Sequence, residues 1–210
     1  MNMDTRVSAL ALAEPSPPDA DLRRIDHAAV ERAAGDLLRG LGADLEAEGL
    51  EETPRRVAEA YAELLSPQTF RPTTFPNDDG YDDLIVATAI PFHSLCMHHL
   101  LPFHGVAHVG YLPGEQIIGL SKLGRVVEFF SRDLQIQERL TTQVADWLER
   151  ELEPKGVGVV LEAEHMCMSL RGVQKLGTQT VTSALRGLVR DDPRTRQEFL
   201  ALTTRSSHDH

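Results

Sequence analysis

The amino-acid sequence predicts an α+β fold in which an antiparallel four-stranded sheet packs on paired helices. The first observation is the order of the segments: helices, two strands, two helices, two strands and a final helix. The second is the alternation within the strand-like segments, the clearest of which has apolar residues at 157, 159, 161 and 163. The third is the helical spacing of apolar residues in the remaining segments. Helices and strands grouped in this way favour a segregated α+β architecture.

The N-terminal part is predicted to be helical after a mobile tail. Residues 1–24 are rich in Ala, Pro, Ser and Asp, a composition that does not support a packed core. From Asp26 to Leu45, apolar residues recur at helical spacing. Thr53-Pro54 then combines an N-cap oxygen with a proline in the first turn, which predicts the start of a second helix.

The middle of the chain predicts strands followed by two helices. Segments 84–91 and 106–112 are interpreted as strands, and Pro113-Gly114 as a turn that leads back into 116–120. Ser121 is expected to cap the next helix. A second helix is predicted from about Leu134 to Leu152, where Pro154 and Gly156 end it.

The C-terminal part predicts two further strands and a short helix. The strands are 157–167 and the Thr-rich segment 178–184, and Asp192-Pro193 opens the last helix. Residues 206–210 are expected to form a disordered tail. The predicted organisation is therefore one domain over 25–205, with a helical part at 25–66 and a core at 84–205.

Composition excludes several classes of function. The chain has 210 residues, two cysteines and a formal net charge of −11. This charge argues against a general nucleic-acid or anionic-membrane surface, and no apolar run approaches the ~20 residues of a membrane span. No signal peptide is recognised, and two cysteines give no disulfide framework, so we expect a cytoplasmic protein.

The most informative stretch is Phe92–Gly105, which holds four histidines and one of the two cysteines. Cys96 and His99 lie three residues apart, so one turn aims a thiolate and an imidazole at a common point, as zinc requires. His98, next to His99, should point elsewhere and be free to move protons.

The second cysteine, Cys167, supplies the other half of the site. If the strand continues to position 167, His165 and Cys167 share one face. Cys96, His99 and Cys167 then form a Cys₂His set, typical of a catalytic zinc that leaves a fourth position open. The alternative is a structural zinc closed by His165 or His98.

Four motifs together resemble GTP cyclohydrolase I, in the same order and at matching separations, from about Asp26 to about Arg205. They are Cys96–His99, Ile118–Arg125, Gln135–Thr141 and His165–Gly172. The resemblance implies a tunnelling fold (T-fold) whose subunits combine their sheets into a barrel. It also implies a homodecamer of two stacked pentamers with active sites at subunit interfaces.

The reaction implied is the zinc-assisted hydrolysis of GTP to formate and 7,8-dihydroneopterin triphosphate. By this resemblance, His98 and His165 are acid/base groups, and Glu138 binds the guanine edge with help from Gln137. Lys122, Arg125 and Arg171 resemble the cations that bind the triphosphate. Ser121 is a candidate for the ribose or triphosphate, and Arg56 and Arg139 are further substrate-binding candidates.

One departure from the family concerns Met97, where family members usually carry a glutamate. The thioether removes a charge and a hydrogen-bond acceptor beside the metal loop. Two alternatives to the full cyclohydrolase therefore stay open at this point. One is a divergent paralogue with another product or substrate, and the other is a non-catalytic nucleotide- or pterin-binding homologue.

Overall fold

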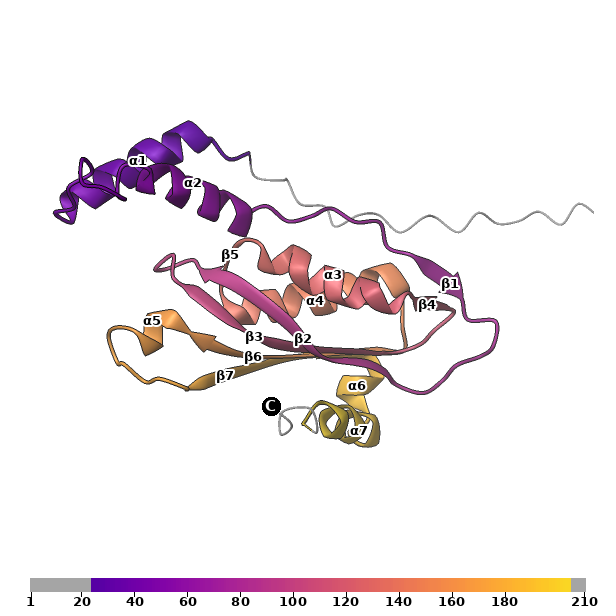
Figure 1. The fold of residues 1–210 in the computed structure, drawn as a ribbon. Coiled ribbons are helices and arrows are strands. Elements are labelled where there is room, and N and C mark those ends of the chain that lie inside the picture. The colour runs from indigo at the N-terminus through magenta and orange to yellow at the C-terminus, as the bar shows by residue number, and fades with distance from the viewer. Residues whose placement is uncertain (1–23, 205–210) are drawn as a thin grey trace, which may run out of the picture.

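The computed structural model describes residues 24–204, so the expected tails lie outside the described residues except for Arg24. Four long antiparallel strands form the sheet, and helices cover both of its faces (Figure 1). The strands are β2 (Ile85–Cys96), β3 (Pro102–Leu112), β6 (Gly156–His165) and β7 (Gln179–Arg186). A fifth strand, β5 (Leu134–Gln135), pairs in parallel with the end of β2, giving the order β5-β2-β3-β6-β7. The predicted four-stranded antiparallel sheet is confirmed, with this short addition.

Two helices pack on one face of the sheet and enclose the main core. They are α3 (Leu120–Ser131) and α4 (Gln137–Leu152). Their apolar faces meet the alternate residues of β3 and β6 that point towards them, as the alternation predicts. Fully buried side chains in this layer include Phe103, Leu140 and Leu161.

The opposite face is covered at one end by α6 (Gly187–Asp191) and α7 (Pro193–Thr204), as Figure 1 shows. Phe199 of α7 is fully buried against this face. A Cβ built on Gly158 would lie 2.6 Å from the Phe199 ring, so glycine at this position allows the helix to approach the sheet.

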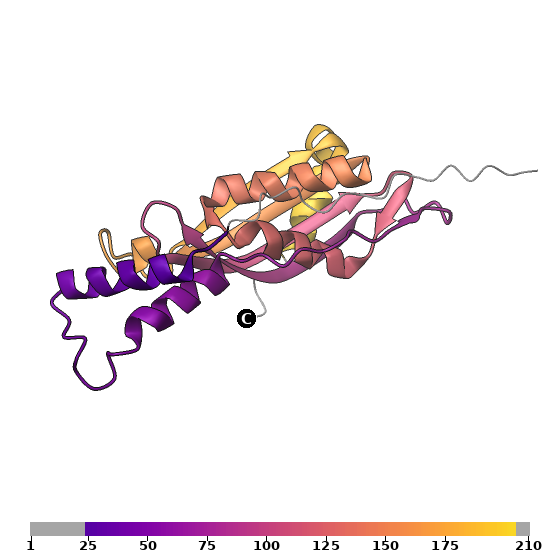
Figure 2. The same ribbon diagram turned by 90° about the horizontal axis from the view of Figure 1, so that it is seen from above.

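The N-terminal helices form a hairpin that extends beyond the sheet in both views (Figures 1 and 2). Helix α1 (His27–Gly40) begins at Asp26, whose carboxylate accepts a hydrogen bond from the N–H of Ala29. It ends at Gly40, so the predicted continuation to Leu45 is wrong. Helix α2 (Thr53–Leu64) starts at Thr53 itself, and Glu52 occupies the N-cap position.

Several predicted boundaries are corrected by the structure. Segment 116–120 does not pair with β3; its residues Gln116–Ile118 form β4, which pairs with β1 (Thr74–Pro76) in a separate two-stranded sheet. Helix α3 begins at Leu120 after Gly119, so Ser121 is not its N-cap. Helix α4 begins at Gln137 because the preceding residues pair with β2 as β5.

Candidate metal centre and its surroundings

The loop after β2 presents the first half of the site. Strand β2 continues to Cys96, further than the predicted end near position 91. A tight turn follows, in which the N–H groups of His99 and Leu100 donate to the carbonyl of Cys96 at 3.2 and 2.9 Å. Leu100 has a φ of 56°, in the left-handed region that few non-glycine residues adopt. This turn places the side chains of Cys96 and His99 on the same side of the loop, with the sulfur 3.7 Å from Nδ1 of the imidazole.

The second half of the site is held by a short helix rather than by a strand. Strand β6 ends at His165, and residues 166–169 form α5 (Met166–Ser169), so the strand argument for Cys167 is wrong. The helical turn nevertheless brings this thiol to the first half-site. One ligand atom from each of Cys96, His99 and Cys167 lies within 4.8 Å of the other two.

The donor set fits a thiophilic divalent metal. Two thiols and one imidazole form the Cys₂His pattern of a zinc site with room for a further ligand. Both cysteines are free, and Cys96 is buried while Cys167 is partly exposed. Burial raises the pKa of the Cys167 thiol, and the neighbouring Cys96 adds to that rise. A bound cation would reverse this effect, because metal binding deprotonates thiols.

Arg171 and His98 lie beside the three candidate ligands. The Arg171 guanidinium nitrogen Nη1 is 3.4 Å from Nε2 of His99 and donates to the Cys167 carbonyl at 3.4 Å. Nδ1 of His98 lies 3.9 Å from the Cys96 sulfur. His98 therefore does not point away from the cluster, contrary to the expectation from its position next to His99.

His165 is held on two sides. Its ring stacks on the buried ring of Phe103, with centroids 4.6 Å apart and planes inclined by 2°. Its Nε2 lies 2.8 Å from Oε1 of Gln137. Burial lowers the pKa of His165, and the nearby Glu138 carboxylate opposes that shift.

The start of α4 contributes three predicted residues in different ways. Gln137 is buried, and its amide nitrogen donates to the carbonyls of Leu161 and Thr180 at 3.0 and 2.9 Å. Glu138 lies in the first turn of the helix and is exposed. Arg139 donates to Oε1 of Gln135 at 2.8 Å and also to a β5 carbonyl, so its guanidinium binds protein groups.

Ser121, Lys122 and Arg125 lie at the other end of the sheet. They belong to the first turns of α3, which follows directly on β4. The N–H of Ile118 in β4 donates to the hydroxyl of Tyr111 at 3.1 Å, and Tyr111 pairs with Val157 near the start of β6. His165 ends that strand eight residues later, which corresponds to roughly 25 Å at the usual rise per residue. One chain therefore does not bring these three residues to the thiol cluster.

Arg56 and the hollow beside it belong to the helical hairpin. Nη2 of Arg56 donates to the carbonyl of Gly49 at 2.8 Å and to the hydroxyl of Thr53 at 3.3 Å.

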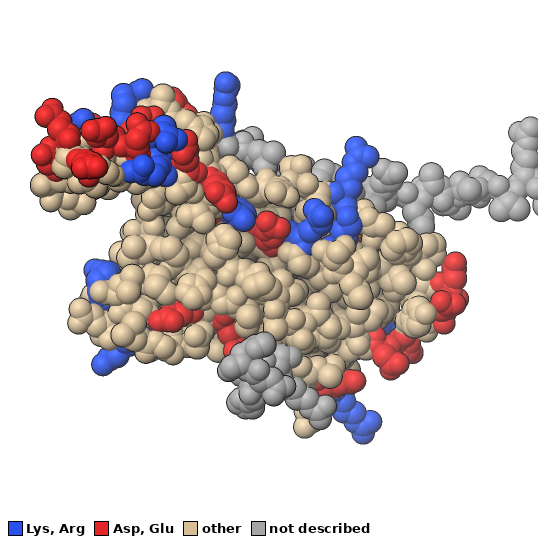
Figure 3. Space-filling model, in the orientation of Figure 1, with Lys and Arg blue, Asp and Glu red and all other residues tan. Residues whose placement is uncertain are grey.

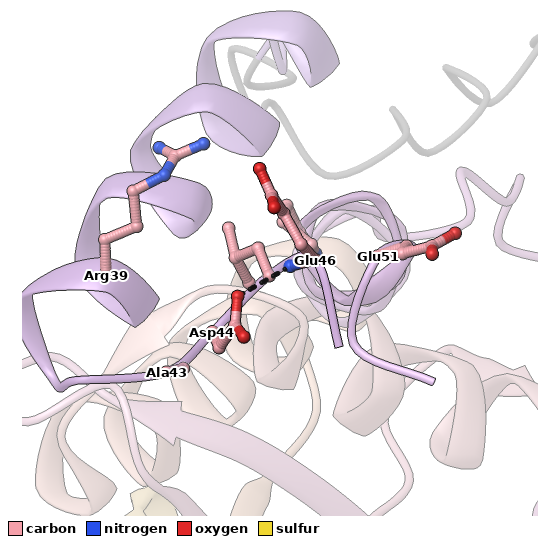
Figure 4. Close-up of a pocket in the computed structure, with 7 residues that line it drawn as sticks. Arg39, Ala43, Asp44, Glu46 and Glu51 are labelled. Carbon is pink, nitrogen blue, oxygen red and sulfur yellow. Dashed lines mark hydrogen bonds between the residues drawn. The ribbon is translucent and has the colours of Figure 1, made fainter. Parts of the chain in front are cut away.

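A hollow of about 480 Å³ opens between α1 and α2, where Arg39, Asp44, Glu46 and Glu51 line it (Figure 4). The Asp44 carboxylate there accepts from the N–H of Glu46, which closes a local turn. Charged side chains also gather over this hairpin, whereas the rest of the face in Figure 3 is mostly uncharged.

Two contacts at the site were missed from the sequence. Tyr61 of α2 donates its hydroxyl to the carbonyl of Leu100 at 3.2 Å, which connects the helical hairpin to the loop that carries Cys96 and His99. Glu164 accepts hydrogen bonds from Ser169 at 2.5 Å and from the N–H of Gly177 at 3.1 Å, which anchors the segment after α5. No periodicity marks such long-range contacts; for Glu164, the charged residue inside an apolar strand was the available signal.

Two thiols and an imidazole that converge at one end of an antiparallel sheet, beside further histidines, are typical of a metal-assisted hydrolase on an α+β scaffold. The sequence pattern of the GTP cyclohydrolase I family matches residues 30–204. A GTP cyclohydrolase 1 of Aquifex aeolicus is 51% identical over 178 residues, which cover 85% of this chain and 97% of the relative. GTP cyclohydrolase 1 of Mycobacteroides abscessus is 48% identical, over 86% of this chain and 91% of the relative.

The chain therefore belongs to the GTP cyclohydrolase I family, a family of hydrolases with the T-fold. A solved archaeosine synthase QueF-like structure in the apo form has a TM-score of 0.39 and 14% identity, over 51% of this chain and 94% of that chain. This likeness is too low to add to the assignment. Within residues 24–204, every helix is too short or too polar to cross a bilayer.

Proposed function

We propose that this chain converts GTP and water to formate and 7,8-dihydroneopterin triphosphate. The observation that carries the proposal is the convergence of Cys96, His99 and Cys167 from two distant segments of the chain. Relatives about half identical in sequence, named GTP cyclohydrolase 1, support the same reaction. Neither the divergent paralogue nor the non-catalytic homologue receives comparable support.

Cys96, His99 and Cys167 would hold zinc. When bound, zinc would supply Lewis acidity and lower the pKa of a coordinated water to about 7, which favours hydration of the purine C8 at neutral pH. Both thiols must be reduced to bind it, which supports a cytoplasmic location.

His98 and His165 would move protons during ring opening. Attack on C8 requires N7 to accept a proton, and His98, beside the candidate ligands, is suited to donate it. His165 would serve as the second acid/base group, because its ring is fixed by stacking and by Gln137. Ser121 is a candidate to hold the ribose or the triphosphate.

Glu138 would bind the guanine edge. A carboxylate offers two acceptors to the N1–H and the exocyclic amine, and the Glu138 side chain is exposed beside His165. Arg171, Lys122 and Arg125 would bind the triphosphate. Arg56 and Arg139 bind groups of their own chain, so they are weaker candidates for this role.

The site would be completed by a second copy of the chain. The thiol cluster and the Lys122–Arg125 turn lie at opposite ends of the sheet, so two neighbouring copies would each supply one part. Sheet order leaves β7 at one edge and most of β2 at the other, available for pairing. Exposed apolar side chains support such contacts: Leu37, Leu41, Leu120, Leu176 and Val181. A decamer of two stacked rings, as the family resemblance implies, would pair these strand edges and bury these apolar side chains.

Turnover of GTP by the zinc-loaded protein tests the proposal, with formate and pterin followed together. Equal amounts of the two products are expected. Formate without pterin would indicate a block after deformylation. The absence of both products would overturn the proposed reaction.

The two neighbouring histidines provide a matched pair of variants. His99→Asn should lose zinc. His98→Asn should keep zinc, and its kcat should fall about 10²–10⁴-fold, as expected when a general acid is removed. Zinc content measured on the purified variants separates these roles, and equal zinc loss in both would contradict them.

A further inference from the structure

We infer that Gln137 is a positioning residue that fixes the His165 imidazole in one orientation and as its Nε2–H tautomer, so that Nδ1 is the ring nitrogen left to contact substrate. This inference rests on the proposed function only for its kinetic consequence. The tautomer itself follows from the hydrogen bonds of the buried amide.

The orientation of the Gln137 amide is determined by its partners. Its nitrogen lies 3.0 Å from the carbonyl oxygen of Leu161 and 2.9 Å from that of Thr180. Both partners accept only, so they require the NH₂ group, and both of its hydrogens are used. A flipped amide would place its oxygen against two carbonyl oxygens in a buried site, at the cost of unsatisfied groups.

The amide oxygen therefore faces His165 and can only accept. The separation of 2.8 Å between Oε1 and Nε2 requires the imidazole to donate from Nε2. This holds whether the ring is neutral or positively charged, because both nitrogens of the charged form carry hydrogen. The hydrogen bond to Gln137 therefore occupies Nε2 and leaves Nδ1 as the ring nitrogen that can act on substrate.

The ring is also fixed in orientation. It lies parallel to the Phe103 ring at 4.6 Å, and Phe103 and His165 are paired residues of neighbouring strands. Stacking fixes the plane of the imidazole, and the bond to Gln137 fixes its rotation within that plane. A group fixed in this way loses little freedom when it transfers a proton.

The burial of Gln137 favours a positioning role over direct contact with substrate. The Gln137 residue is only 2% exposed, and its donor hydrogens are both committed to the sheet. Donation from the Gln137 side-chain amide to the guanine would require these bonds to break. The exposed Glu138, one residue further along α4, is the better placed of the two for that contact.

Thr141 offers a matched control. It lies one turn along the same helix, donates to the carbonyl of Gln137 at 2.7 Å, and its hydroxyl is 2.7 Å from that of Thr182 on β7. It therefore attaches α4 to the sheet without contacting His165. Thr141→Val, like Gln137→Met, should lower the free energy of unfolding by removing a hydrogen bond between α4 and the sheet. It should leave the hydrogen bond between Gln137 and His165 in place.

Kinetics of the zinc-loaded variants test the role. Gln137→Met should lower kcat by about 10–100-fold, as is typical when an orienting partner is lost, with KM for GTP nearly unchanged. Thr141→Val should keep kcat within about twofold of the parent. In a His165→Asn background, Gln137→Met should cause no further loss. A rise in KM at constant kcat, or equal losses of kcat in Gln137→Met and Thr141→Val, would overturn the inference.

The tautomer has a readout that does not depend on activity. Nitrogen NMR of histidine-labelled full-length protein distinguishes a protonated Nε2 from a protonated Nδ1, and His165→Asn assigns the signal. The wild type should show the hydrogen on Nε2, and an Nδ1–H tautomer would overturn the inference even if Gln137→Met failed to fold. Absence of GTP turnover in the wild type would instead count against the proposed function and leave this measurement valid.

Discussion

Tyr61 donates its hydroxyl to the carbonyl of Leu100 at 3.2 Å, and so joins the N-terminal helices to the loop that carries Cys96 and His99. Leu100 has a left-handed backbone, a conformation that persists only where its surroundings stabilise it. The helical hairpin is therefore part of the support of the metal loop, although it contributes none of the three candidate ligands.

Replacing Tyr61 by phenylalanine should weaken zinc binding. The variant removes one hydrogen bond to the loop, so we expect a loss of about 0.5–1.5 kcal/mol in stability and about tenfold in zinc affinity. A competitive titration against a chromogenic chelator measures the affinity. Tyr81→Phe is the control, because its hydroxyl binds Asp79 in an exposed loop. Equal zinc affinity of Tyr61→Phe and the parent would contradict the predicted support.

Mixing two inactive variants should restore activity if two copies complete one site. Lys122→Ala/Arg125→Ala removes the cationic turn at one end of the sheet, and Cys96→Ser removes a candidate metal ligand at the other. Each variant alone should be inactive, whereas co-assembled protein should recover about one quarter of wild-type activity, since a random pairing places both intact parts together at that frequency. No recovery in verified mixed assemblies would show that each chain builds its site alone.

Met97→Glu should change turnover by less than about tenfold. The Met97 side chain is 44% exposed, and its N–H donates to the carbonyl of Gln135 at 3.0 Å, so the main chain positions this loop residue. Steady-state kcat/KM for GTP in Met97→Glu and Met97→Leu provides the measurement. A hundredfold gain with glutamate alone would instead show that the missing carboxylate has a catalytic role.

Acid should destabilise the fold through His108. This residue is fully buried, its Nδ1 accepts from the N–H of Ala89 at 3.4 Å, and burial lowers its pKa, with Glu162 opposing the shift. In the unfolded chain the imidazole titrates near pH 6.5. The stabilisation is therefore complete above about pH 6.5 and is lost as the pH falls below it, because only the unfolded state then gains the proton readily.

Urea unfolding at pH 7.5 and 5.5 measures this loss. His108→Gln should reduce the difference in unfolding free energy between the two pH values, although it lowers stability at pH 7.5. His104→Gln, at an exposed position of the same strand, is the control and should keep the difference. An unchanged difference in His108→Gln would assign the acid sensitivity to other groups.

The sequence predicted the four long strands, because alternation and the β-propensity of a Thr-rich segment are local patterns. The same pattern failed at Cys167, where the chain leaves β6 at His165 and turns into α5. The thiol reaches Cys96 through this turn rather than through strand parity. Spacing singled out the three candidate ligands, whereas their convergence depends on a turn that periodicity does not encode.

Long-range pairing accounts for the other differences. Leu134 was interpreted as helical because its apolar neighbours fit that period, but β5 forms there through pairing with β2. Gln137 was grouped with the substrate-binding residues by resemblance to the family, as an aid to Glu138. Its burial under β6 and β7 is visible only in three dimensions.

The pairing of β5 with β2 restricts the length of the connection between β5 and α4. Its two residues pair with Leu95 and Cys96, and the helix that carries Gln137 and Glu138 starts immediately afterwards. Inserting one residue between Gln135 and Gln137 would lengthen this connection by roughly 3.3 Å, because Ile136 has an extended backbone, and would displace the start of α4 relative to the loop that carries Cys96 and His99. Natural variation should therefore replace side chains in this connection more readily than it adds or removes residues.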